Sequence, residues 1–268
     1  MRASHLVGLS LFIAPIACGD DENGTPTPSE PGLINGQWAS LRVSSQCFDG
    51  PLGSDRVLFT WLSRHSILQN ETSNRITTEI CNVTLTPYRG SSSTYPAAAV
   101  EGFDVDNVFI EDGRAEGASF SFGPQTILLG WTPSGNPVSE PLPTEDTDPR
   151  LVDADDDGNP GATLGISGLI EGNVYIANRN VVRATGTVVS ADRITGTTTT
   201  EASQRIVGAD NIFLINNSTV VTDDPNANSS PFEMIRLASN VTCEEITAQL
   251  FTLTSTGTPT DCPIDSGD

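Results

Sequence analysis

Three long runs of β-forming residues near the end of the chain restrict the fold more than any other feature. They cover residues 162–170, 173–189 and 193–207, and they are rich in Val, Ile and Thr, which favour extended strands. Short polar joints around residues 171–173 and 190–192 separate the runs, so each run can fold back beside the previous one. Long antiparallel strands with tight connections are typical of an up-and-down barrel or a large meander. The sequence therefore predicts an all-β protein.

Shorter segments of the same kind occupy most of the remaining chain. The expected strands are residues 38–43, 57–62, 75–85, 105–110, 115–122, 127–131, 212–221 and 232–237, with a hairpin turn at Asp112-Gly113. A short helix is expected at residues 242–251, where Thr242 can cap the first turn. We predict one β domain over residues 37–268, an antiparallel, lipocalin-like barrel or meander, with a β-sandwich as the alternative. An acidic, proline-rich composition makes residues 133–161 a long loop of that domain.

The most concentrated chemical feature is the acidic segment at residues 153–159, inside that loop. Asp153, Asp155 and Asp157 occupy alternate positions, and Gly158 allows a sharp turn after the third aspartate. Calcium takes about six to eight oxygen ligands, and closely spaced aspartates in a turning loop can supply several of them. We predict that Asp153, Asp155 and Asp157 bind calcium, with the carbonyl oxygen of Asn159 as a fourth ligand. The alternative is a solvated acidic turn that holds no ion.

This D-x-D-x-D-G pattern resembles the calcium loops of EF-hands and of thrombospondin type 3 repeats. The closing glutamate of an EF-hand would fall at Leu164, and the expected flanks are strands and turns instead of helices. The resemblance to a single thrombospondin type 3 loop is closer, because Asn159-Pro160-Gly161 follows the aspartates. We expect the ion to have a structural role, fastening the loop at residues 133–149 to the strand that begins near Ala162.

The first residues of the chain have the features of an export signal. Residues 1–17 carry Arg2 and then an apolar core that is too short to span a bilayer. Residues 18–36 are acidic and rich in proline, so we expect a flexible tether. Pro15-Ile16-Ala17-Cys18 resembles the lipobox of bacterial lipoproteins, which implies a lipid anchor on Cys18. With Gly19 next to the cysteine, the resemblance also implies sorting to the outer membrane, as in uncharacterised lipoproteins of Gram-negative bacteria.

Cysteine usage agrees with export. With Cys18 set aside, Cys47, Cys81, Cys243 and Cys262 remain, an even number that suits disulfides in an oxidising compartment. We favour the pairs Cys47–Cys81 and Cys243–Cys262, because the members of each pair lie close in sequence. No C-x-x-C motif is present, which argues against a redox or zinc role.

Charge and side-chain chemistry exclude several classes of function. The net charge is −21, and such a field repels nucleic acid and anionic lipid head groups. All 13 basic residues are arginine, so neither a Schiff-base lysine nor a P-loop lysine is available. After the leader the chain has a single histidine, His65, which we expect on a half-exposed strand. It cannot build a multi-histidine zinc site, and no G-x-S-x-G elbow accompanies it.

The sequence favours a non-enzymatic lipoprotein of the cell envelope, whose β domain binds a small ligand or another envelope component. Its contact with the membrane would be made through the lipid anchor alone. The alternative is a carbohydrate-binding module with structural calcium, in which Trp38, Trp61 and Trp131 form a stacking platform for sugars. A glycoside-active enzyme that uses two carboxylates is a third hypothesis, although no local motif selects the pair. An apolar cavity would favour the ligand binder, and a filled core would favour a structural role.

Overall fold

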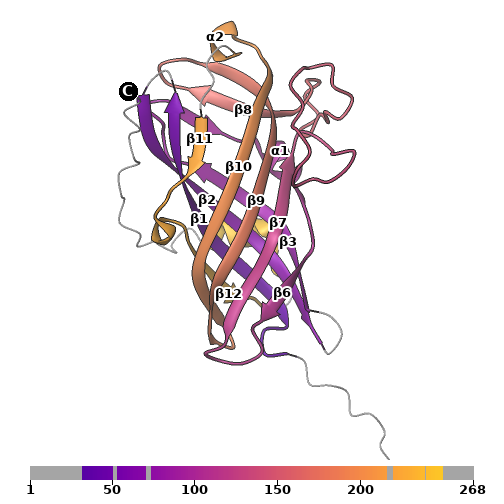
Figure 1. The fold of residues 1–268 in the computed structure, drawn as a ribbon, viewed down its shortest axis with the longest axis vertical. Coiled ribbons are helices and arrows are strands. Elements are labelled where there is room, and N and C mark those ends of the chain that lie inside the picture. The colour runs from indigo at the N-terminus through magenta and orange to yellow at the C-terminus, as the bar shows by residue number, and fades with distance from the viewer. Residues whose placement is uncertain (1–31, 51–52, 71–73, 216–219, 239, 250–268) are drawn as a thin grey trace, which may run out of the picture. The chain divides into compact units, whose positions relative to one another are not determined.

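A closed antiparallel ring of 8 strands dominates the computed structural model (Figure 1). The structure describes residues 32–50, 53–70, 74–215, 220–238 and 240–249. In ring order the strands are β1 (Gly36–Gly50), β2 (Gly53–Gln69), β3 (Asn74–Leu85), β6 (Val108–Asp112), β7 (Ser119–Leu129), β9 (Gly172–Ser190), β10 (Arg193–Ala209) and β12 (Pro231–Arg236). β7 pairs directly with β9, although the long loop and β8 separate them in sequence. β12 pairs with β1 and closes the ring. The predicted up-and-down barrel is therefore confirmed, and the sandwich alternative is wrong.

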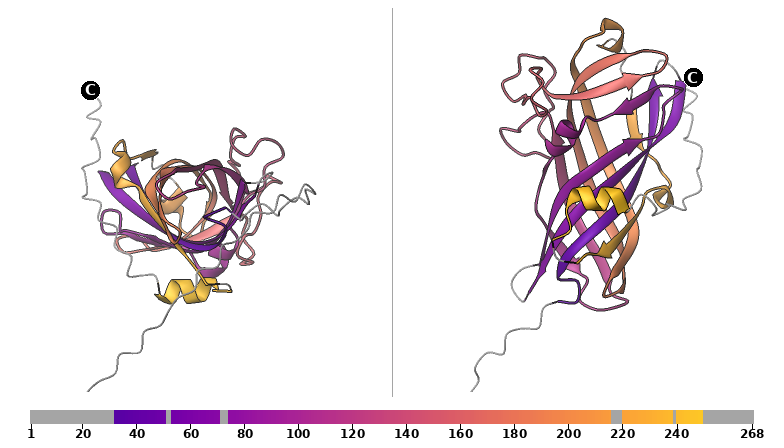
Figure 2. Two further views of the ribbon diagram at one scale, coloured as in Figure 1. Left: turned by 90° about the horizontal axis from the view of Figure 1, so that it is seen from below. Right: turned by 180° about the vertical axis from the view of Figure 1, so that it is seen from behind.

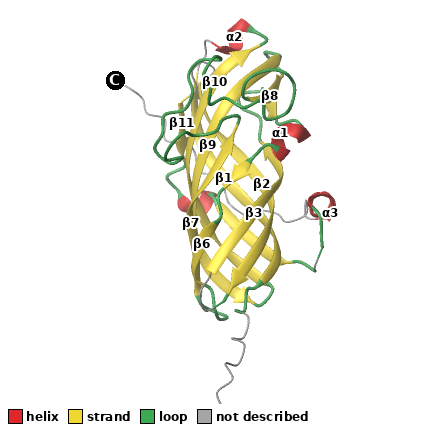
Figure 3. Cartoon of the chain, turned by 90° about the vertical axis from the view of Figure 1, so that its right-hand side faces the viewer, coloured by secondary structure: helices red, strands yellow, loops and turns green. Residues whose placement is uncertain are grey.

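Shorter elements extend or cover this ring. They are β4 (Ser92–Thr94), α1 (Ala97–Glu101), β5 (Asp104–Val105), β8 (Ala162–Ser167), α2 (Ile212–Ile215), β11 (Val220–Asp223), the 3-10 helix η1 (Ala227–Ser229) and α3 (Cys243–Gln249). β8 pairs with β9 near the end of the barrel that carries α1 and α2 (Figure 3). The segment at residues 212–221, predicted as a strand, instead begins with α2. None of the helices in the described residues is long and apolar enough to cross a membrane.

Side chains fill the barrel in layers. One apolar layer lies at the end where the described chain begins, and it includes Ile34, Trp38, Phe120, Ile194 and Met234. A second apolar layer lies at the other end, where α1 packs against the strands, and it includes Trp61, Ala99, Leu129, Leu164 and Ile176. Buried polar side chains lie between the two layers. The strand alternation therefore points apolar residues inward at both ends of the barrel and polar residues inward at its middle.

Arg236 closes the barrel at the end that carries Trp38. Its guanidinium lies over the indole ring of Trp38, 4.6 Å from the ring centroid. The same group donates hydrogen bonds to the carbonyl oxygens of Leu33 (2.6 Å) and Ala191 (2.7 Å). Trp38 in turn donates from Nε1 to the carbonyl oxygen of Ile34 at 2.8 Å. One cation thus ties the residues before β1 to the β9–β10 turn and to the end of β12.

The helix α3 lies across the outer wall of the barrel (Figure 2). Ile246 is 1% exposed and packs against Ala39 and Leu62 on that wall. Thr242 accepts a hydrogen bond from the backbone N–H of Glu245, whose carboxylate accepts one from the backbone N–H of Thr242, which is a capping box. The predicted cap at Thr242 is confirmed.

A disulfide fastens α3 to the barrel. It joins Cys81 in β3 to Cys243 at the start of the helix. The favoured pairs Cys47–Cys81 and Cys243–Cys262 are therefore wrong. Cys47 is also disulfide-bonded. Cys18 and Cys262 both lie outside the described residues, together with the predicted leader and most of the predicted tether.

Candidate functional site

The loop between β7 and β8 carries the three predicted metal ligands. Its backbone is tied to the barrel wall, because Val152 donates its N–H to the carbonyl oxygen of Gly130 at 3.1 Å. Gly161 donates to Val152 (3.1 Å), and Ala154 donates to Gly161 (2.9 Å). These bonds close residues 152–161 into a turn that starts and ends at the barrel. The aspartates are therefore presented by a defined backbone.

Arg150 holds the preceding part of the same loop. Its guanidinium forms ion pairs with Glu140 (2.8 Å) and Asp148 (2.7 Å), and it lies 5.8 Å from the ring centroid of Trp131. The hydrogen bond from Arg150 lowers the pKa of Asp148 to about 2. Trp131 is buried and donates from Nε1 to the carbonyl oxygen of Asn178 in β9. The long loop is thus packed onto the outside of the barrel up to the aspartates.

The three aspartates converge on one point. Each of Asp153, Asp155 and Asp157 offers a carboxylate oxygen, and these oxygens all lie within 4.8 Å of one another. The carboxylate of Asp153 also accepts hydrogen bonds from the backbone N–H groups of Asp157 (3.1 Å) and Gly158 (2.9 Å). The structure therefore brings the predicted ligands together in a cluster that can hold a metal ion.

A barrel residue orients two of these carboxylates. Thr163, which is buried in β8, donates its backbone N–H to Asp155 (3.1 Å) and its hydroxyl to Asp157 (2.7 Å). Desolvation raises the pKa of Asp157, but hydrogen bonds from Thr163 and Asn159 outweigh it and hold the pKa below its ordinary value. Asp157 is therefore charged at neutral pH, as a cation ligand must be.

One oxygen of these aspartates has no hydrogen-bond partner among the described residues. It is the buried Oδ1 of Asp155, although buried polar atoms are normally satisfied. A bound cation would satisfy it. Asn159 uses its backbone N–H and its side-chain amide to bond Asp157, at 2.8 and 3.2 Å. The role of its carbonyl oxygen as a fourth ligand stays a prediction.

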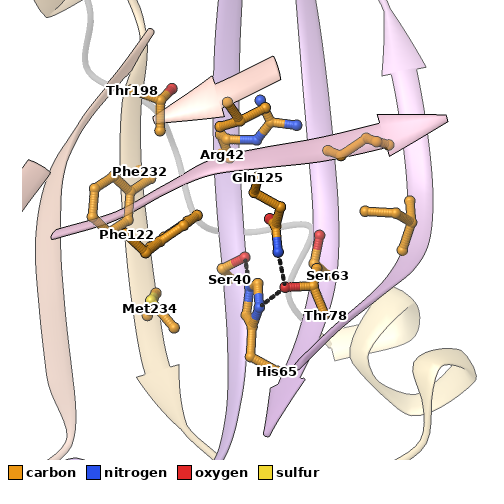
Figure 4. Close-up of a pocket in the computed structure, with 13 residues that line it drawn as sticks. Ser40, Arg42, Ser63, His65, Thr78, Phe122, Gln125, Thr198, Phe232 and Met234 are labelled. Atoms are coloured by element: carbon orange, nitrogen blue, oxygen red, sulfur yellow. Dashed lines mark hydrogen bonds between the residues drawn. The ribbon is translucent and has the colours of Figure 1, made fainter. Parts of the chain in front are cut away.

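A second polar cluster lies inside the barrel, and it was not predicted. His65 is 5% exposed, so the expectation of a half-exposed strand histidine is wrong. Its Nε2 lies 2.6 Å from Ser40 Oγ, and its Nδ1 lies 2.9 Å from Thr78 Oγ1 (Figure 4). Gln125 donates its side-chain amide to the same threonine at 3.1 Å. The histidine is held by hydrogen bonds on both ring nitrogens.

This cluster does not have the properties of a catalytic triad. The partner that orients His65 is a hydroxyl group, where a triad needs a carboxylate. Desolvation, with a further contribution from the charge of Arg42, lowers the pKa of His65 to about 3. The adjoining cavity has a volume of about 20 Å³, enough for a single water-sized particle. A serine buried beside so small a space cannot meet a substrate.

The tryptophans are also placed differently from a sugar-binding platform. Trp38, Trp61 and Trp131 are 0, 3 and 3% exposed, and they lie in three separate clusters of buried residues. The stacking row considered for a carbohydrate-binding module is therefore not present on the surface.

Comparison of the chain with protein-family models, curated proteins and solved structures finds no match.

Proposed function

We propose that this chain is a non-catalytic β-barrel lipoprotein of the cell envelope, anchored through Cys18 and stabilised by calcium bound to Asp153, Asp155 and Asp157. The convergence of the three carboxylates is the observation that carries the metal site, and it is supported by the buried oxygen of Asp155 that has no partner among the described residues. Calcium is the ion of choice, because it is a hard cation that prefers oxygen ligands and accepts irregular geometry.

The filled interior favours a structural role for the barrel over transport of a small ligand. Apolar layers occupy both ends, and the central cavity holds about 20 Å³. A second hollow is lined by residues of β2 and β3 and by Gln37, Asn240 and Val241, and Glu79 is its only carboxylate. Neither it nor the central cavity contains the two carboxylates that a glycoside-active enzyme would need. The buried tryptophans remove the main support for the carbohydrate-binding alternative.

Calcium would fasten the loop to the barrel. Thr163 belongs to β8 and already holds Asp155 and Asp157, so an ion that joins these carboxylates to Asp153 would link the loop to the wall. Without an ion, three close carboxylates repel one another. The folded state would therefore bind calcium more tightly than the unfolded chain does.

Thermal unfolding with calcium or with a chelator tests this proposal. Calcium at about 100 times its dissociation constant should stabilise the folded chain by about 2.7 kcal/mol. Asp155→Asn should abolish the effect. Asp156→Asn is the matched control, because Asp156 lies in the same turn, has a φ of 55° and is not part of the cluster. Equal calcium responses in the two variants would contradict the proposed site.

The anchor is tested separately by expression of the full chain in a Gram-negative host with labelled palmitate. The wild type should incorporate the label and sediment with the outer membrane, whereas Cys18→Ser should do neither. Incorporation that persists in Cys18→Ser would place the lipid elsewhere, and no incorporation in the wild type would remove the anchor.

A further inference from the structure

The small cavity at the centre of the barrel lies beside a buried positive charge, that of Arg42. It lies in the polar layer, and Ser40, Arg42, Ser63, His65, Gln125 and Thr198 supply its polar walls (Figure 4). Its volume of about 20 Å³ suits one particle the size of a water molecule or a halide ion. The calcium cluster, on the outside of the barrel, uses none of these residues.

Arg42 is the only cation on this wall, and it is almost fully buried. The residue is 8% exposed, and its guanidinium donates one hydrogen bond, to Thr200 Oγ1 at 3.3 Å. It also lies over the ring of Trp61, at 4.6 Å from the centroid. Among the described residues, no carboxylate oxygen lies within ion-pair distance of it. A buried charge that has no ion-pair partner destabilises the fold unless an opposite charge lies nearby.

Asp223 is a weak counter-charge for Arg42. It acts on Arg42 electrostatically without a contact, and its own hydrogen bond goes to the backbone N–H of Thr200 at 3.2 Å. Desolvation raises the pKa of Asp223, and the positive charge of Arg42 acts in the opposite direction. Burial lowers the pKa of Arg42 to about 9, so the guanidinium is still charged at neutral pH.

Unused hydrogen-bond donors gather around the same cation. Ser63 is 4% exposed and lines the cavity. Trp61 Nε1 and Ser44 Oγ are buried and have no hydrogen-bond partner among the described residues. The cross-strand pairs Arg42–Trp61 and Ser44–Phe59 place these groups on adjacent inward positions of β1 and β2. The indole N–H of Trp61 can only donate and the serine hydroxyls can donate or accept, so donors for an acceptor in the cavity are available near Arg42.

We propose that the cavity binds one small monovalent anion, of the size of chloride, between the Arg42 guanidinium and the Ser63 hydroxyl. The ion would supply the missing negative charge and would accept hydrogen bonds from both groups. Phosphate, sulfate and carboxylic acids are too large for a space of about 20 Å³. The other occupant of that size is a water molecule, which would leave Arg42 with the charge of Asp223, a residue that does not touch the guanidinium.

Anion-dependent stability tests this proposal on the full chain. The protein is unfolded thermally at fixed pH, fixed calcium and fixed ionic strength while gluconate, which cannot enter, is replaced by chloride. The midpoint should rise with chloride and approach saturation, because an ion that binds only the folded state stabilises it. A midpoint that is the same in both salts would overturn the proposal.

Variants locate the site. Arg42→Met should remove the chloride dependence, and Ser63→Ala should weaken the chloride affinity by about tenfold, since one hydrogen bond to a charged group is lost. Arg56→Met is the matched control: Arg56 has a side chain that is 12% exposed, and it lies 3.9 Å from a carboxylate of its own, that of Asp224. It should keep the full chloride response. Loss of the response in Arg56→Met, or its retention in Ser63→Ala, would contradict the assignment.

A crystal soaked in bromide gives a direct readout that does not require Arg42→Met to fold. An anomalous peak beside Arg42 and Ser63 is the expected result. Density for a water molecule without an anomalous peak would show that the cavity is hydrated and would refute the anion site.

Discussion

The acid sensitivity of the fold should depend on one buried imidazole. His65 is enclosed between Ser40 and Thr78, and desolvation lowers its pKa from 6.5 to about 3. Between these two pH values, His65 is protonated in the unfolded chain but stays neutral in the folded chain. The free energy of unfolding therefore falls as the pH falls below 6.5, and this contribution stops growing near pH 3.

The magnitude follows from the two pKa values. Each pH unit inside the window removes about 1.4 kcal/mol, so His65 costs the fold about 2 kcal/mol at about pH 5 and almost nothing at about pH 7.5. The full shift corresponds to an upper limit of about 5 kcal/mol, reached near the lower end of the window. Among the side chains with an ordinary pKa, histidine alone titrates between about pH 5 and 8, so carboxylates dominate only at lower pH.

The assay compares urea unfolding of the wild type with that of His65→Gln, at about pH 7.5, 6 and 5. Glutamine keeps a donor and an acceptor but cannot be protonated in this range. The wild type should lose about 2 kcal/mol more than the variant between about pH 7.5 and 5. Carboxylate titration is common to both proteins and cancels in the difference. Parallel pH profiles would show that His65 is protonated inside the fold and would refute the reasoning.

Further predictions concern one end of the barrel, the disulfide on its outer wall and the loop. Arg236→Met should lower the free energy of unfolding by about 3 kcal/mol in urea titrations, because it leaves the partly buried carbonyl oxygens of Leu33 and Ala191 unpaired. Arg183→Met, which removes an exposed ion pair, should cost less than about 1 kcal/mol. The double variant Cys81→Ser/Cys243→Ser should lose about 4–5 kcal/mol, since the disulfide closes a long loop, and a loss near zero would contradict this. Thr163→Val should weaken calcium binding by several fold in a calorimetric titration, and an unchanged affinity would show that the hydroxyl does not position the ligand.

The strands were predictable because their pattern is local. The paired runs that became β9 and β10 have alternating side chains and a short turn between them, which leaves little choice but an antiparallel pair. The apolar run at residues 212–221 was misassigned for the opposite reason. Short apolar segments do not distinguish strand from helix by periodicity, and the structure begins this one with α2.

The disulfide and the interior site depend on contacts that no local pattern shows. Cys81 and Cys243 are 162 residues apart in sequence, and they meet only because α3 packs on the outer wall beside β3. Ser40 and Arg42 alternate with apolar neighbours along β1, which normally marks a solvent-facing side. The barrel turns this side inward. The aspartate cluster was predictable because its ligands lie at alternate positions of one short segment.

Calcium binding by the loop at residues 153–157 can be measured directly by calorimetric titration. Calcium is titrated into the chelator-treated full chain and into Asp153→Asn and Asp155→Asn. We expect the wild type to have a single site with a dissociation constant below about 1 mM, and we expect both variants to lose it. No binding below about 1 mM, or binding that survives both substitutions, would contradict it.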